Sequence, residues 1–502
     1  MSVNREHASP TATPLMEVLR AAAGKYPGKT ALVQGEKRLR YPELVELIDL
    51  LARDLRERGV FPGHLVALRF PNSIAYIVLT YAVWKCGGAV LPIAVELTGA
   101  EVGSIFNRIR PDFCISDRAN GGGEPMACTR LETSCFFEAL KPEMKFQAGI
   151  PDLAFVRFTS GTTGTFKGVA LSHGTIIDRI TALNRMLRIG PDDTVVWVLS
   201  MAHHFVSTIV LYLSSGASIV LSAGVPAERI LDAVEKEQAT VLYAAPFHYA
   251  LLSAEASQRK MTAIRMAIST TISLPESVFM NFYNRFGLPI LQAYGIIETG
   301  LVCVNIDNPL EKKNSVGRAV TGYDIEIRDR FRPVDGEPEC GRLFVRGPGF
   351  FNAYFSPFRA AETVLENGWF DTGDVGRKDP EGFVYILGRH KDLINVAGMK
   401  VFPQEVERVL DAHPDIRESR VFGMESTRHG EVVAAEVVPA EASRLTERDL
   451  RNYCRSRLAS YKIPGIIRFV DHIEKTAVTS KIIRHRREAG RAAYAGEIEH
   501  AG

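Results

Sequence analysis

The sequence predicts an α/β fold with a largely parallel sheet, followed by a smaller domain of mixed helices and strands. Strand-length apolar runs alternate with helix-length segments, as in Leu65–Phe70, Ser73–Cys86 and Ala89–Pro92, which is typical of strands joined by crossover helices. Around Gly341–Gly347 shorter alternating runs replace this pattern. A chain of 502 residues is also too long for one ordinary domain.

Two helical blocks are expected over residues 15–60, where apolar residues such as Met16, Leu19 and Ala23 recur at helical spacing. Further strands of the large domain are expected at Thr194–Leu199, Ser218–Leu221, Val241–Ala244, Ile264–Ser269, Leu343–Arg346 and Gly382–Leu387. The smaller domain is expected to contain a helix at Pro403–Ala412, strands near Arg420–Met424 and Val432–Val438, and a helix at Glu447–Ala459. These changes divide the chain into residues 1–388 and 389–502.

The composition is that of an ordinary globular protein with little net charge. The formal net charge is +2, which argues against a general nucleic-acid binder. The 7 cysteines include no CxxC pair, so reduced thiols are expected rather than a zinc site or disulfides. No apolar run is long enough to span a bilayer, and Met1–Pro14 lacks the apolar core of a signal peptide. We therefore expect a cytoplasmic protein.

Glycines and hydroxyl residues dominate the segment Phe158–Gly168, which follows a mostly apolar run. Glycines let the backbone approach a phosphate closely, successive N–H groups form an anion nest, and Lys167 adds a positive charge. A Walker loop is excluded because it requires Gly-Lys-Ser/Thr, whereas Phe166 precedes Lys167 and Gly168 follows it. From this segment alone, a purely structural turn is an open alternative.

Ser160–Gly168 resembles the signature loop of the acyl-adenylate-forming superfamily, which includes acyl-CoA synthetases, peptide-synthetase adenylation domains and luciferases. Three further segments follow in the order found in that family. Gln292–Glu298 is similar to its Tyr-Gly-x-Thr-Glu motif, Trp369–Asp374 to its Thr-Gly-Asp motif, and Gly388–Glu407 to its hinge motif. The resemblance therefore extends over almost the whole chain.

The resemblance implies a large N-terminal domain of stacked mixed sheets with flanking helices and a β-barrel-like part, and a small mobile α+β C-terminal domain. It also implies an activity, the ATP-dependent conversion of a carboxylic acid to an acyl-AMP with release of pyrophosphate. The acyl group would then pass to the thiol of coenzyme A. The implied cofactors and substrates are ATP, Mg²⁺, coenzyme A and a carboxylic acid.

The same resemblance assigns roles to residues. Tyr294 would pack against adenine, Asp374 would accept both ribose hydroxyls, and Glu298 would ligate the magnesium ion. A carboxylate suits the ribose because it is an acceptor with two oxygens. Lys481 would neutralise charge on the acyl carboxylate and the α-phosphate, a kind of electrostatic stabilisation that is usually the largest catalytic contribution. The implied nucleotide-binding residues are Thr159, Ser160, Gly161, Thr162, Thr163, Gly164, Lys167, Tyr294, Gly295, Asp374 and Arg389, and the implied catalytic residues are Lys481, His203, Thr163 and Glu298.

By the same resemblance, His203 is the candidate for a gate beside the acyl pocket. The pocket itself would be lined by His204, Phe205, Thr271 and Ile272, and Phe205 and Ile272 would give it an apolar character. The small domain would rotate about Lys391 between the two half-reactions. That rotation would bring the loop at Ala397 and Gly398 to the site and open a channel for the thiol.

Several residues depart from the pattern of the family on the nucleotide side. Ile297 stands where the family has a phosphate-binding threonine, and Ser269–Leu274 replaces the usual Ser-Gly-Gly-Ala-Pro-Leu run. In the lysine loop, Glu474 replaces a proline and Ser480 replaces a glycine. Catalysis that depends on the positioning of reacting groups is sensitive to displacements of ~1 Å. An enzyme that mainly performs the thioester-forming half-reaction on a supplied acyl-AMP is therefore an alternative.

Two other functions are open alternatives. The first is a stand-alone ligase that loads the phosphopantetheine of a carrier protein. The second, from a different class, is a catalytically dead nucleotide-binding scaffold, against which the joint presence of Lys167, Glu298, Asp374, Arg389 and Lys481 argues. The acid is expected to be apolar or bulky, because Phe205–Leu211 contains no aspartate that could pair with the amine of an amino acid.

Overall fold

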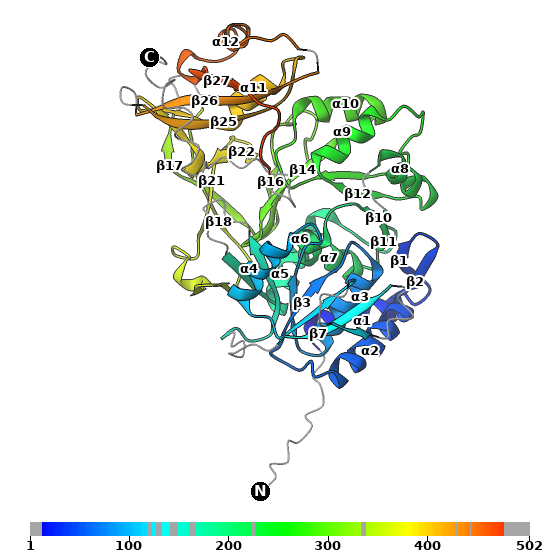
Figure 1. Cartoon of the computed structure of the whole chain (residues 1–502). Coiled ribbons are helices and arrows are strands. Elements are labelled where there is room, and N and C mark those ends of the chain that lie inside the picture. Colours follow the sequence, from blue (N-terminus) through cyan, green and yellow to red (C-terminus); the bar gives the residue numbers. More distant parts are fainter. Residues whose placement is uncertain are drawn as a thin grey trace.

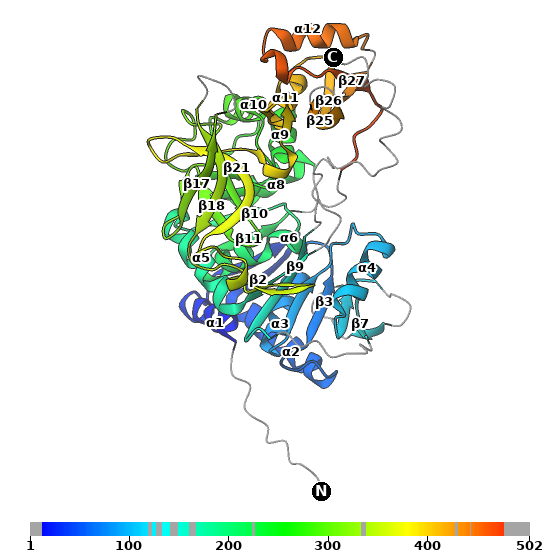
Figure 2. The same ribbon diagram turned by 90° about the vertical axis from the view of Figure 1, so that its left-hand side faces the viewer.

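The computed structural model describes residues 13–118, 123–126, 133–140, 149–159, 167–222, 226–332, 338–426, 430–441 and 443–475 (Figure 1). Two large sheets with helices between and around them are followed by a smaller antiparallel sheet. A small unit of helices and strands lies at the end of the molecule opposite to helices α1 (Pro14–Lys25) and α2 (Tyr41–Glu57) (Figures 1 and 2). The predicted α/β class and the stacked mixed sheets are confirmed.

The first large sheet has a parallel centre and antiparallel edges. Its strand order is β16 (Arg318–Ala319), β15 (Gly300–Val304), β14 (Ile290–Ile296), β13 (Met266–Ser269), β12 (Val241–Ala244), β10 (Thr194–Trp197), β11 (Ser218–Leu221), β1 (Thr30–Gln34) and β2 (Lys37–Arg40). The strands from β1 to β14 in this order are parallel. Strands β11, β12 and β13 are buried along their whole length, as expected of apolar strands covered on both faces.

The second large sheet also combines parallel and antiparallel pairs. Its strand order is β20 (Phe358–Ala360), β19 (Ala353–Phe355), β9 (Lys167–Ser172), β8 (Leu153–Thr159), β4 (Ala89–Pro92), β3 (Leu65–Arg69), β5 (Phe113–Ser116), β7 (Cys135–Ala139) and β6 (Glu124–Met126). Strands β8, β4, β3 and β5 are parallel neighbours, whereas β9 returns antiparallel to β8. The predicted strand–helix–strand unit is confirmed, with α3 (Ile74–Lys85) between β3 and β4.

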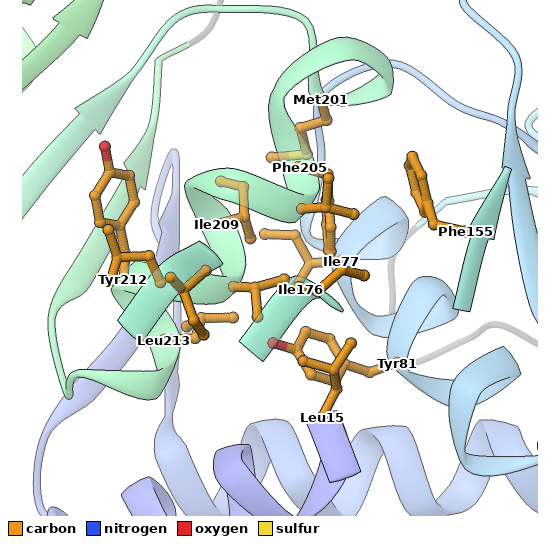
Figure 3. Close-up of a cluster of buried hydrophobic side chains, with 14 of the residues drawn as sticks. Leu15, Ile77, Tyr81, Phe155, Ile176, Met201, Phe205, Ile209, Tyr212 and Leu213 are labelled. Carbon is orange, nitrogen blue, oxygen red and sulfur yellow. The ribbon is translucent and has the colours of Figure 1, made fainter. Parts of the chain in front are cut away.

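A layer of helices lies between the two large sheets. Helix α3 is buried on all sides from Ile74 to Trp84, which explains why its sequence has no polar face. Figure 3 shows side chains of α3 packed with those of α5 (His173–Leu187) and α7 (Ile209–Ser214). The outer faces are covered by α4 (Gly99–Ile109), α8 (Ala227–Lys236), α9 (Pro246–Ala254) and α10 (Glu276–Phe286). Among the described residues, no helix combines the length and apolarity that a bilayer span requires.

The third sheet is antiparallel and corresponds to the part expected to be barrel-like. Its strands are β17 (Asp324–Phe331), β18 (Cys340–Arg346), β21 (Phe370–Lys378) and β22 (Val384–Arg389). Gly317, beside β16, joins this sheet to the first one, because its carbonyl accepts a 2.8 Å bond from Val384 N. The backbone of Gly317 has φ +88°, and a Cβ there would lie 2.1 Å from the carbonyl oxygen of Val304. Glycine is therefore required by both conformation and space.

Replacing Gly317 by alanine is expected to destabilise the protein by about 3 kcal/mol or more, because left-handed strain and backbone crowding add. Gly382→Ala is the matched control, since Gly382 has the same φ of +88° but no atom within 4 Å of a Cβ. The control variant should lose only about 1–2 kcal/mol of folding stability, which is the effect of the left-handed backbone strain alone. Urea unfolding followed by circular dichroism measures both, and equal losses would contradict the crowding argument.

The C-terminal unit has a core of its own around Val406, Val421 and Leu450. Its elements are β23 (Ile394–Val396), β24 (Met399–Val401), α11 (Pro403–Asp411), β25 (Ile416–Ser426), β26 (Gly430–Pro439), α12 (Glu447–Arg455) and β27 (Ile466–Phe469), with the short helices η4 (His390–Asp392) and η5 (Ser460–Lys462). The predicted helices and strands are therefore present, and α12 ends earlier than expected. Phe402 packs against Val375 of β21, which holds this unit against the third sheet.

Candidate functional site

The ends of the predicted phosphate loop lie side by side at the edge of the second sheet. Thr159 ends β8 and Lys167 begins β9, and these two residues are partners in the antiparallel register. The remaining predicted residues of the loop, and the predicted catalytic lysine, lie outside the described residues: Ser160, Gly161, Thr162, Thr163, Gly164 and Lys481. Their roles stay predictions.

Three of the predicted nucleotide-binding residues meet in one cluster. Asp374 of β21 and Arg389 of β22 are partners in the antiparallel register, and Asp374 is 4% exposed. Asp374 Oδ1 lies 2.9 Å from Arg389 Nε, and the Tyr294 hydroxyl donates a hydrogen bond to Asp374 Oδ2. The residues come from the first and third sheets, so the cluster forms where these sheets adjoin.

Electrostatics hold this cluster in one protonation state. Burial, together with the negative charge of Asp374, raises the pKa of Tyr294 well above its usual value, so the phenol stays protonated and donates. Burial works against the charge of Arg389, but nearby negative charge, chiefly that of Asp374, outweighs it and raises the pKa of the guanidinium. The result is a buried carboxylate held between a cation and a neutral donor.

Gly295, next to Tyr294, is needed for the packing of the first sheet. A Cβ on Gly295 would lie 2.2 Å from the carbonyl oxygen of Gly300 in the neighbouring strand β15. Close approach of the two backbones thus accounts for this glycine, whatever it contacts in a ligand.

Glu298 lies in the turn between β14 and β15 and is held by groups from three other elements. Its backbone carbonyl accepts bonds from Arg179 Nη2 at 2.7 Å and from Phe351 N at 2.8 Å. Its carboxylate Oε1 accepts a 3.2 Å bond from the hydroxyl of Tyr354 in β19. Lys167 Nζ lies 4.7 Å from the centre of the Tyr354 ring. Tyr354 therefore connects two predicted site residues that are 131 positions apart, from 167 to 298.

No pattern in the sequence distinguishes Tyr354 as a site residue. It lies among several aromatic residues between 350 and 355, and no spacing distinguishes it from its neighbours. Burial and the charge of Glu298 raise its pKa, so its hydroxyl is a donor to the carboxylate. Only the pairing of β19 with β9 brings it to the site.

The predicted acyl residues fall into two environments. His204 lies beside a pair of stacked rings, 6.4 Å from Trp197 and 6.1 Å from Tyr243 between ring centres. Phe205, in contrast, is 1% exposed and packs with Tyr76 in the core between the sheets (Figure 3). Packing in the core therefore explains why position 205 carries an aromatic side chain.

The loop after β13 presents an apolar side chain to solvent. Ile272 is 47% exposed, although isoleucine is usually buried. Thr271 beside it has φ +83°, a conformation that strains a β-branched residue and in which glycine would be unstrained. Such strain is maintained only where the surrounding structure fixes the backbone, as it commonly does at ligand sites.

His203 is connected to the rest of the site through its backbone. Its ring Nδ1 lies 3.2 Å from Ser200 Oγ, and its carbonyl oxygen accepts a hydrogen bond from Arg157 Nη1. Arg157 belongs to β8, two residues before Thr159, and was not singled out from the sequence. The signal that could have found it is an arginine inside an otherwise apolar strand.

The predicted hinge and thiol-channel residues lie at the start of the C-terminal unit. Lys391 is exposed in η4, directly after Arg389 and His390. Ala397 and Gly398 form the two-residue turn between β23 and β24, with φ of +48° and +89°. Both values are those of a type I′ hairpin turn, which makes this tip tight and exposed.

The chain is similar to known adenylating proteins over nearly its whole length. Residues 19–355 match the family model of the AMP-binding enzyme, and residues 405–479 match that of the AMP-binding enzyme C-terminal domain. The chain is 29% identical over 488 residues to an indoleacetate–CoA ligase of Aromatoleum aromaticum, covering 92% of this chain and 96% of that protein.

Solved structures agree with these matches. One is the o-succinylbenzoate CoA synthetase of Bacillus subtilis in complex with its acyl-adenylate intermediate, at 26% identity and a TM-score of 0.81, covering 94% of this chain and 98% of that chain. The same synthetase in complex with ATP and a magnesium ion has 25% identity and a TM-score of 0.80, covering 93% and 98% of the two chains.

Proposed function

Because the chain belongs to the family of AMP-binding enzymes, we propose that it is an acid–thiol ligase that forms acyl-CoA thioesters. It converts a carboxylic acid and ATP to an acyl-AMP and pyrophosphate, and then transfers the acyl group to coenzyme A. The observation that carries this proposal is the cluster of Asp374, Arg389 and Tyr294. It offers acceptor oxygens and a positive charge together, as a ribose 5′-phosphate requires.

The residues present fit ATP and a magnesium ion. A carboxylate accepts up to about four hydrogen bonds, so Asp374 can bind Arg389 and ribose hydroxyls together. Glu298 offers a carboxylate oxygen, the ligand that Mg²⁺ prefers. Among the described residues, Tyr354 is the hydrogen-bond donor to that carboxylate, and it contacts one of the two oxygens. Bound there, Mg²⁺ would neutralise charge on the phosphates.

In the first half-reaction, a carboxylate oxygen of the acid attacks the α-phosphorus of ATP, and the bond to the β-phosphate oxygen breaks. Negative charge moves from the carboxylate to the departing pyrophosphate. Lys167 and Lys481 supply the positive charges that offset it, and no general base is needed because the acid is ionised at neutral pH. Arg389 and Asp374 hold the nucleotide in place.

In the second half-reaction, the sulfur of coenzyme A attacks the acyl carbon, the carbon–oxygen bond to AMP breaks, and the thiol proton is released. We propose that the unit after residue 388 rotates about Lys391 between the two steps. Ala397 and Gly398 then approach the site, and the tight turn that they form supports this role because it presents backbone groups at an exposed tip.

We propose an apolar, bulky or aryl acid as the substrate. The ring of His204, which lies beside the buried Trp197 and Tyr243, and the exposed Ile272 support this class. Relatives named for indoleacetate and ferulate support it as well. A cytoplasmic location, where ATP and coenzyme A are supplied, is part of the same proposal.

A direct test incubates the protein with ATP, Mg²⁺ and coenzyme A across a panel of fatty and aryl acids, and measures pyrophosphate and thioester. A parallel reaction receives preformed acyl-AMP in place of acid and ATP, and another receives a phosphopantetheinylated carrier protein in place of coenzyme A. Release of pyrophosphate together with acyl-CoA supports the proposal. Thioester from acyl-AMP alone, or binding of ATP without turnover of any acid, contradicts it.

Glu298→Gln is expected to lower the rate of pyrophosphate release by about 100-fold and to raise the Mg²⁺ concentration needed for half-maximal rate, because an amide is a weaker ligand for a hard cation. Glu276→Gln is the matched control, since Glu276 is paired with Lys313 at the surface. An unchanged Mg²⁺ titration of the Glu298 variant would contradict the assignment.

A further inference from the structure

Arg157 is a positively charged residue of the site to which, within the part of the chain that the structure describes, no carboxylate is bound. It stands in the apolar strand β8, on the same face as the buried Phe155. Among the described residues, Arg157 forms no ion pair, and its Nε is buried without a hydrogen-bond partner. The loop that follows β8, residues 160–166, contains no acidic residue. A buried N–H of a guanidinium is costly to leave without a hydrogen-bond partner, and a ligand could supply one.

The groups around Arg157 place it where the two halves of the site adjoin. One of its terminal nitrogens donates to the carbonyl of His203, the candidate gate of the acyl pocket. The charge of Glu298, the candidate metal ligand, acts on Arg157, as do Tyr76 and Arg179. Thr159, which begins the candidate phosphate loop, is two residues away on the same strand. Arg157 therefore lies between the acyl and the nucleotide residues.

A second unused donor lies in the same region. The hydroxyl of Tyr76 at the start of α3 is fully buried and, within the described ranges, has no hydrogen-bond partner. The charge of Arg157 acts on this phenol, and the Tyr76 ring lies 5.6 Å from that of Phe205, the residue after His204. The Tyr76 hydroxyl is therefore a second donor of this region that no described residue uses.

We propose that Arg157, assisted by Tyr76, binds the reacting carboxylate of the acid in the first half-reaction. This inference rests on the proposed function, because that reaction brings a free carboxylate to the junction of the acyl and nucleotide residues. A guanidinium recognises a carboxylate through charge and through parallel N–H donors. Once the carboxylate has become part of the acyl-AMP, it carries no negative charge, and Arg157 loses its ligand.

The test separates the two half-reactions in Arg157→Met, a substitution that keeps an unbranched apolar stem. The KM for the acid should rise by about 10- to 100-fold, as expected for loss of a charge-assisted hydrogen bond. The KM for ATP and the rate of thioester formation from preformed acyl-AMP should change little. Arg157→Lys should recover part of the acid affinity, and Tyr76→Phe should show a smaller rise in the same KM.

Arg179→Met is the matched control for a purely structural arginine. Arg179 is buried and donates to the backbone carbonyls of both Gly349 and Glu298, so its loss should lower the melting temperature and slow both half-reactions. If Arg157→Met behaves in the same way, Arg157 is structural and the proposal is wrong. A rise in KM confined to dicarboxylic acids would assign Arg157 to a second carboxylate and would also overturn it.

The wild-type protein is assayed first on matched monocarboxylic and dicarboxylic acids. If it releases no pyrophosphate with any acid, the proposed function fails, and the role of Arg157 fails with it. If the wild type is active and Arg157→Met keeps the same KM for every acid, only the role of Arg157 is overturned.

Discussion

Asp374→Asn is expected to lower kcat/KM for ATP by about 100- to 1000-fold, because the change removes the charge from two strong hydrogen bonds to the ribose. The side chain keeps its size, but the amide presents one acceptor oxygen instead of two. The variant also loses the ion pair in which Arg389 Nε lies 2.9 Å from Asp374 Oδ1. Initial rates of pyrophosphate release at varied ATP measure the effect.

Asp379→Asn is the control for this variant. Asp379 follows β21, has a side chain that is 10% exposed, and pairs with Lys312 at 2.9 Å, but it lies at the other end of the β21–β22 hairpin from Asp374. Its loss should reduce the melting temperature with little effect on the KM for ATP. If both variants lower kcat/KM for ATP equally, the effect comes from distortion of the hairpin, and Asp374 does not bind the ribose.

Lys481→Ala is expected to reduce acyl-AMP formation by about 1000-fold, because removal of one stabilising charge or donor at a transition state costs about 100- to 1000-fold and Lys481 is expected to serve both reacting anions. Thioester formation from preformed acyl-AMP should be retained, since that step does not bring together the carboxylate and the α-phosphate. The two half-reactions are measured separately, as pyrophosphate release and as acyl-CoA formation.

Lys475→Ala controls for the loss of a lysine from the same segment. Lys475 forms an ion pair with Glu418 of β25, so its side chain has a partner within the C-terminal unit. Equal loss of adenylation in both variants would point to unfolding of this segment. An unchanged adenylation rate in Lys481→Ala would show that another group supplies the charge, and Ser480 would then mark a real change of the loop.

Local physical chemistry explains which elements could be predicted. Helix α3 was expected at Ser73–Cys86 and is found at Ile74–Lys85, because a run of apolar residues this long between two strands has few other conformations. The short parallel strands could be identified because both of their faces are apolar. The end of α12 was misjudged because helix ends depend on capping and on packing against neighbours.

Only part of the candidate site could be predicted from local patterns in the sequence. Motif resemblance named Tyr294, Asp374 and Arg389 one at a time, with an adenine or a ribose as the partner of each. The structure adds that they bind one another, since the Tyr294 hydroxyl donates to the carboxylate that pairs with Arg389. Tyr354 could not be recognised, because it is one of several aromatic residues in its segment until β19 pairs with β9. Arg157 is distinguished in the sequence only as an arginine in an apolar strand, and its contact with His203 is what connects it to the site.

The sequence by itself determined the α/β class, the change to a small C-terminal unit, and the ordered motifs that identify an adenylating enzyme, because periodicity and motifs are encoded in neighbouring residues. The tertiary structure alone decided the sheet order, in which β1 lies beside β11 and β9 lies beside β19. It also decided that Tyr354 donates to Glu298 and that Arg157 reaches His203. Contacts of this kind depend on how distant strands pair and on which charges are buried together, and no local pattern in the chain specifies them.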